Sequence, residues 1–191
     1  AELCVNLYCS GFLKHEYGYF PQCMSRYFFR NPDKLLEKIR GDDALYFEFQ
    51  WHYRLPSEAF FDIGQLLHWT DVMINASDSD ADKVTLVGSI LGKAPDGDDG
   101  IFPIETVRKL LKIKKNEELT TAVAREKINS LGLRDVEDGK KEREKSDIYK
   151  MQARAMEIDY PQTSVILRIL ANFYERESKR DQISSEIEPL Q

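Results

Sequence analysis

The stretch YFEFQWHYRL, residues 46–55, decides whether the fold contains a β element. From residue 47 onward, the odd positions carry large apolar side chains: Phe47, Phe49, Trp51, Tyr53 and Leu55. The even positions between them are polar: Glu48, Gln50, His52 and Arg54. Alternation with a period of two is typical of a strand that buries one face. The pattern covers residues 44–55 and predicts a strand that ends before Pro56. An aromatic helix is the competing interpretation, because the neighbouring segments have helical spacing.

The rest of the chain places apolar residues three and four positions apart, which is the spacing of amphipathic helices. Helices are predicted after the cap pair Asn31-Pro32, in the segments 58–75, 103–113, 117–131 and 138–158, and from Pro161 onward. Residues 83–91 favour a helix, with a strand as the alternative. Within 138–158 the apolar stripe consists of Ile148, Met151, Ala155 and Ile158. The sequence therefore predicts a mainly α-helical bundle, in which residues 44–55 are the candidate for a small β element.

The strongest break in these patterns is GKAPDGDDG, residues 92–100, where glycine, proline and aspartate make up seven of nine positions. Such a composition favours a loop over a helix or strand. It separates an aromatic-rich half, residues 1–95, from a charged helical half, residues 96–191. A chain of 191 residues is also compatible with one single domain.

Charge and composition argue against several classes of function. The chain has 27 Lys and Arg against 33 Asp and Glu, a net charge of −6, so it has no general attraction to nucleic acid or anionic membrane. No apolar run reaches the roughly 18–20 residues needed to cross a bilayer, and the N-terminal residues lack the pattern of a secretory signal. We therefore expect a soluble cytoplasmic protein, with no disulfide framework from its three cysteines.

No motif for a cofactor, a metal or a common catalytic mechanism occurs in the chain. Phosphate-binding loops, dinucleotide fingerprints and the nucleophile elbow are all missing. The run Asp78–Asp82 imitates the start of a calcium loop, but Lys83 stands where that loop needs glycine. The sequence therefore predicts neither a cofactor nor a metal site.

Glu48 and His52 are the candidates for catalysis. On a strand they would share one face, two pleats apart, where a carboxylate and an imidazole can act as an acid and base pair in a hydrolase. A polar stripe of this kind is more commonly the solvated side of a half-buried element. The chain is for this reason expected not to be an enzyme, with a hydrolase as the alternative.

One cluster of four basic residues and one separate arginine are the candidates for binding. Arg108, Lys109, Lys112 and Lys115 lie on one predicted helix with few acids nearby, and such a cluster can follow a phosphate backbone. Arg168 lies between apolar neighbours, where we expect it to be partly buried against a carboxylate of another helix. Nucleic-acid binding is possible on this pattern but is not favoured over a solvated helix face.

Three segments of the second half together form one distinctive pattern: DGIFPIETVRKLL (99–111), the run from Tyr149 to Ala155, and PQTSVILRILANFYERESKRD (161–181). In these segments the chain resembles the C-terminal helical module of a set of uncharacterised bacterial proteins. The resemblance implies a bacterial, intracellular protein and no particular activity. Taken together, the sequence predicts a non-enzymatic interaction or regulatory module whose partner is another protein or a second copy of itself.

Overall fold

The computed structural model describes residues 22–40, 49–50, 52–75, 80–131 and 139–187. These residues form α2 (Gln22–Arg30), α3 (Pro32–Ile39), the 3-10 helix η1 (Ser57–Phe60), α5 (Ile63–Asn75), α6 (Asp80–Leu91), α7 (Glu105–Lys114), α8 (Glu117–Asn129), α9 (Lys140–Met156) and α10 (Pro161–Ile187). The described part contains no strand, so the prediction of a mainly α-helical protein is confirmed. None of its helices is both long and apolar enough to cross a membrane.

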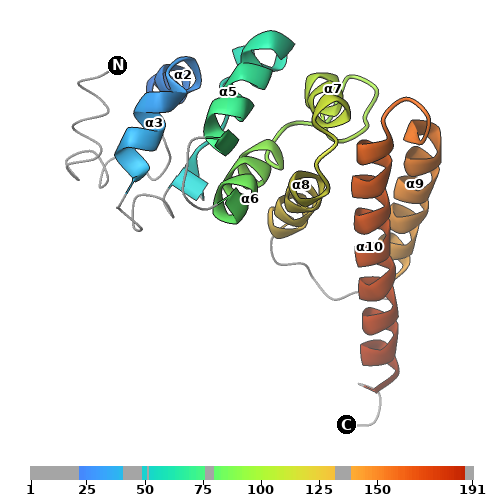
Figure 1. Cartoon of the computed structure of the whole chain (residues 1–191). Helices are drawn as coiled ribbons and strands as arrows, with labels where there is room; N and C mark the ends of the chain where they lie inside the picture. The colour runs from blue at the N-terminus through green and yellow to red at the C-terminus, as the bar shows by residue number, and fades with distance from the viewer. Residues whose placement is uncertain (1–21, 41–48, 51, 76–79, 132–138, 188–191) are drawn as a thin grey trace.

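The helices follow one another across the molecule, from α2 and α3 at one end to the hairpin of α9 and α10 at the other (Figure 1). Helix α10 packs against α7, α8 and α9, whereas the main neighbour of α9 is α10 alone. Helix α9 is thus an edge helix, and much of its surface faces away from the rest of the protein.

The prediction of a strand at residues 44–55 is wrong for the positions that the structure describes. Phe49, Gln50 and His52 have helical backbone, and the amide of Tyr53 donates to the carbonyl oxygen of Phe49 at 3.0 Å. Phe49 and Tyr53 are both fully buried, because residues four apart lie on the same face of a helix. Residues 44–48 and Trp51, which include the candidate catalytic residue Glu48, lie outside the described residues.

Several of the described aromatic residues of the first half, among them Phe28, Phe49, Tyr53 and Trp69, are fully buried and pack against one another. The ring of Phe28 meets that of Phe49 edge to face with 5.3 Å between centroids, and Tyr53 stacks on Trp69 at 6.4 Å. The hydroxyl of Tyr53 is buried and donates to the carbonyl oxygen of Ser25 at 3.1 Å. Edge-to-face and offset pairs are the arrangements that aromatic quadrupoles favour.

Helices α6 and α8 approach each other very closely because glycines stand at the contact, Gly88 within α6 and Gly92 directly after it. A Cβ atom at Gly88 would lie 2.2 Å from the Cβ of Ala122, and one at Gly92 would lie 2.5 Å from the Cβ of Glu126. The two helices belong to the two predicted halves, and one hydrophobic core includes residues of both. The division at residues 95 and 96 stays a prediction.

Polar hydrogen bonds hold α9 against α10. Three serine hydroxyls donate to carbonyl oxygens of the opposite side of the hairpin: Ser146 to Ala171 at 3.0 Å, Ser164 to Ala153 at 2.8 Å, and Ser178 to Gly139 at 2.8 Å. The residues of α9 that are fully buried are accordingly small or polar, namely Glu142, Ser146 and Ala153. Its predicted apolar stripe therefore points elsewhere.

Candidate functional site

The outer face of α9 carries the apolar stripe Ile148, Met151, Ala155 and Ile158, and this stripe is exposed to solvent. Ile148 is 49% exposed, Met151 is 65% exposed, and Ile158, in the turn after the helix, is 91% exposed. The residues are spaced by three and four, so the three helical ones line up along one side of α9. Contiguous exposed apolar side chains on a charged surface are typical of an interaction site.

The turn that carries Ile158 also borders a pocket of about 440 Å³. Apolar side chains from three segments of the chain line it: Phe60, Phe61, Ile104, Met156 and Tyr160. Phe61 is itself 87% exposed, and Asp98 and Asp99 form part of the rim. Side chains of partner proteins commonly insert into such pockets, so the pocket extends the apolar surface beyond the end of α9.

Arg108, a candidate for nucleic-acid binding, is a buried structural residue with only 3% of its side chain exposed. Its guanidinium forms a bidentate pair with Asp99, at 2.6 and 2.7 Å. It also donates to the carbonyl oxygens of Pro103 at 2.6 Å and Ile101 at 3.1 Å. The hydrogen bonds that Arg108 donates to Asp99 hold the pKa of this carboxyl below its usual range. Together with the bonds to the two carbonyls, they tie the loop before α7 to the helix.

The other three residues of that basic set do not form one continuous cationic face. Lys109 pairs with Glu105 at 2.9 Å on the same helix. Lys112 lies over the ring of Tyr160, with its Nζ atom 5.6 Å from the centroid. Lys115 is exposed and caps the C-terminus of α7 with a left-handed backbone conformation. With Arg108 buried, the set offers a weaker phosphate-binding surface than its sequence indicates.

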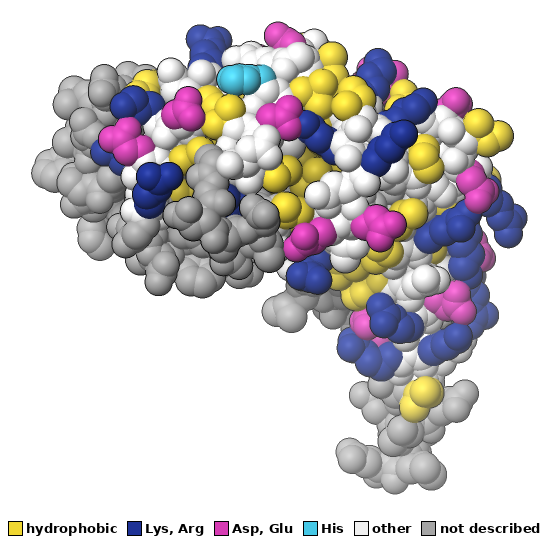
Figure 2. Space-filling view, in the orientation of Figure 1, with side chains coloured by type: hydrophobic (Ala, Val, Ile, Leu, Met, Phe, Trp, Pro, Cys, Tyr) yellow, Lys and Arg dark blue, Asp and Glu magenta, His cyan; other side chains and the backbone are white. Residues whose placement is uncertain are grey.

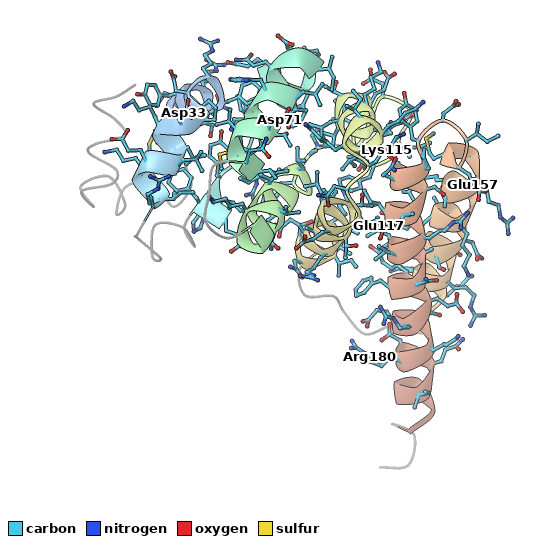
Figure 3. All side chains as sticks on the ribbon, in the orientation of Figure 1. Asp33, Asp71, Lys115, Glu117, Glu157 and Arg180 are labelled. Atoms are coloured by element: carbon cyan, nitrogen blue, oxygen red, sulfur yellow. The ribbon has the colours of Figure 1, made fainter. Side chains whose placement is uncertain are left out.

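Arg168 is exposed rather than partly buried, but it does meet a carboxylate outside its own helix. Its guanidinium lies 2.7 Å from Glu157, which Figure 3 places at the C-terminal end of α9 on the outer edge of the molecule. Among the described residues of the second half, the buried charged side chains are instead Arg108, Glu142 and Asp181. Arg168 therefore links the end of α9 to α10 from the surface.

His52 is exposed on the rim of a separate hollow, together with Arg54, Leu55 and Pro56. Its presumed partner in catalysis, Glu48, lies outside the described residues, so the pair stays a prediction. Among the residues that the structure does describe, His, Cys, Asp and Glu side chains form no group suited to a metal ion.

A polar cluster that the sequence did not indicate lies where residues 49–54 meet α6 and α8. Lys93 is almost fully buried, donates to the carbonyl oxygen of Gln50, and has its Nζ atom 3.7 Å from Glu126. Burial, with the nearby charge of Arg54, lowers the pKa of Lys93 to about 8, and burial raises the pKa of Glu126. The cluster joins the first half of the chain to the second.

Comparisons with known proteins give no indication of the function of this chain. No family model matches the chain, and neither a curated protein nor a solved structure is significantly similar to it.

Proposed function

We propose that the protein is a non-enzymatic interaction module of the bacterial cytoplasm, which binds a helical segment of another protein along the outer face of α9. The observation that carries this proposal is the exposed stripe of Ile148, Met151, Ala155 and Ile158. The bacterial and cytoplasmic parts draw their support from the resemblance of residues 99–181 to a helical module of bacterial proteins.

The way in which α9 is held explains why its apolar side chains are available. Ser146 and Ala153 face α10, and backbone carbonyls accept the hydroxyls that join the two helices. The stripe is therefore not needed for the contact between α9 and α10. An amphipathic helix that places its own apolar residues on such a face is a common mode of recognition.

A selection from a displayed library of helical peptides on the full-length protein tests this proposal. Met151→Glu places a carboxylate in the middle of the stripe, and we expect selected peptides to bind this variant at least about tenfold more weakly than the wild type, because a buried unpaired charge is costly. Thr121→Glu adds the same charge at an exposed position of α8 and should leave their binding unchanged.

The folding of both variants provides the necessary check. Since Met151 and Thr121 are exposed, each substitution should change the free energy of unfolding by no more than about 0.5 kcal/mol. The proposal is wrong if the library yields no binder above background, or if the selected peptides bind the Met151→Glu variant as tightly as the wild type.

A further inference from the structure

The charges beside the stripe indicate what kind of helix fits on α9. Along the edge of α9 that adjoins α10, basic and acidic side chains alternate, but they do not balance. Asp147 and Glu175 both pair with Lys150, at 3.9 and 2.9 Å, and Glu157 pairs with Arg168 at 2.7 Å. The acids of this edge are thus already compensated within the protein.

Two arginines on the same edge of α9 have no such compensation. Arg143 lies seven residues before Lys150 and Arg154 lies four residues after it, so the three side chains share one side of the helix. Both arginines are exposed, and within the described part of the chain no carboxylate forms an ion pair with their side chains. Figure 2 shows Lys and Arg side chains gathered along the hairpin, although the whole chain has a net charge of −6.

The cations on the opposite edge of the stripe, Lys141 and Lys145, are already engaged within the protein. The Nζ atom of Lys145 lies 5.1 Å from the centroid of the Tyr174 ring, and Lys141 also has an interaction partner. Gln152 on the same edge donates to the carbonyl oxygen of Gly100 at 3.3 Å. Among the described residues of α9, arginines without a carboxylate partner therefore flank the stripe only on the side of α10. Complementary charges at the rim of an apolar contact select the partner and its orientation.

We infer that the segment bound by α9 is an amphipathic helix with acidic residues on the edge that faces α10. This inference rests on the proposed function and adds the charge and the orientation of the partner. A protein helix fits better than a nucleic acid because the centre of the surface is aliphatic. Ile148, Met151 and Ala155 offer no aromatic ring on which a base could stack.

A matched pair of stapled helical peptides of about two heptads tests the inference. Both have leucine at the apolar positions, and the flanking positions carry glutamate in one peptide and lysine in the other. Fluorescence anisotropy with the full-length protein should show binding of the glutamate peptide at least about tenfold tighter in about 0.1 M salt. The difference should shrink in about 1 M salt, where the Debye length falls to about 3 Å.

Charge reversal on the protein locates the effect. The double variant Arg143→Glu with Arg154→Glu should abolish or invert the preference for the glutamate peptide. Lys112→Glu with Lys115→Glu makes the same change of net charge at exposed lysines near the C-terminal end of α7 and should preserve the preference. A labelled single-stranded oligonucleotide of mixed sequence, measured on the same variants, tests for nucleic acid.

The possible results separate the inference from the proposed function. If the lysine peptide binds as well as the glutamate peptide, and both lose binding with Met151→Glu, the inference is wrong and the docking function stands. If neither peptide depends on Met151, both are wrong. Tight binding of the oligonucleotide that depends on Arg143 and Arg154 would also overturn the inference, in favour of a nucleic-acid partner.

Discussion

The close crossing of α6 and α8 leads to a sharp prediction for Gly88→Ala. In an exposed helix this substitution stabilises by about 1 kcal/mol, because alanine has the higher helix propensity. Here the new methyl group would lie 2.2 Å from the Cβ of Ala122 and 3.2 Å from its backbone. The contact between the two Cβ atoms is thus about 1 Å or more shorter than the optimal separation of about 3.5–4.0 Å between carbon atoms. A change of side-chain rotamer cannot relieve it, because Cβ atoms move only with the backbone.

The expected result is therefore a loss of stability. Overpacking costs about 1–3 kcal/mol or more, and its upper range applies where two backbones must separate. After the gain in propensity, we expect a net loss of about 2 kcal/mol. For a chain of this length the loss corresponds to a fall in Tm of about 4–8 °C. Urea and thermal unfolding followed by far-UV circular dichroism measure both quantities.

Two further variants show whether the crossing is the cause. Gly64→Ala adds a methyl group near the start of α5, where the nearest atom is Oδ1 of Asp62 at 3.3 Å, and should be neutral or stabilise by about 0.5 kcal/mol. Combining Gly88→Ala with Ala122→Gly moves the methyl group across the interface and should recover about 1–2 kcal/mol relative to the sum of the two single changes. The reasoning is refuted if Gly88→Ala raises Tm as Gly64→Ala does.

Three more predictions concern charge and capping, each measured by chemical denaturation. Asp99→Asn leaves the buried Arg108 without its carboxylate and should lower the free energy of unfolding by about 2 kcal/mol, a value reduced by the partial exposure of Asp99. The control Asp98→Asn should lower it by less than about 0.5 kcal/mol. Equal effects of the two substitutions would contradict this. The pKa of Lys93 is about 8 in the folded protein and 10.5 in the unfolded chain, so between these values the unfolded state binds the extra proton. The free energy of unfolding of the wild type should therefore rise with pH, relative to that of Lys93→Met, by up to about 1.4 kcal/mol per pH unit. A constant difference between the two proteins from pH 7.5 to 9.5 would disprove this. Asn116→Ala removes the cap of α8 and should cost about 1 kcal/mol, while no loss would mean that the cap is redundant.

The sequence predicted best those helices that combine a stripe with a defined start. The side chain of Asn116 accepts from the amide of Leu119 at 2.8 Å, and Pro161 occupies the first position of α10. Both features depend only on local geometry, which a short stretch of sequence contains. The general prediction of a helical bundle is sound for the same reason.

The stretch at residues 46–55 shows why local pattern can mislead. Phe49 and Tyr53 satisfy a period of two, but they are also four apart, which places them on one helical face. A strand needs a neighbour with which to pair, and helices surround this stretch in the described fold. The choice between the two periods thus depends on tertiary contacts that the stretch does not encode.

The candidate sites depended still more on long-range contacts. Arg108 and Arg168 both lie among apolar residues, yet the first is buried against Asp99 and the second is exposed. The stripe of α9 was visible as a pattern, but the small and polar face of the same helix packs inside. The only local feature of Lys93 is that it follows Gly92, one of the two glycines at the contact between α6 and α8, and this does not predict its burial.

The serine bonds of the hairpin have a consequence for how α9 can move. Ser146, Ser164 and Ser178 each require one particular carbonyl oxygen, and the three contacts lie along most of the length of α9. A slide by one residue, or a rotation that turned Met151 inward, would break all three bonds together and leave their hydroxyls and carbonyls without partners. The three hydrogen bonds therefore fix the register and the rotation of α9 on α10, and the apolar stripe stays exposed in the free protein.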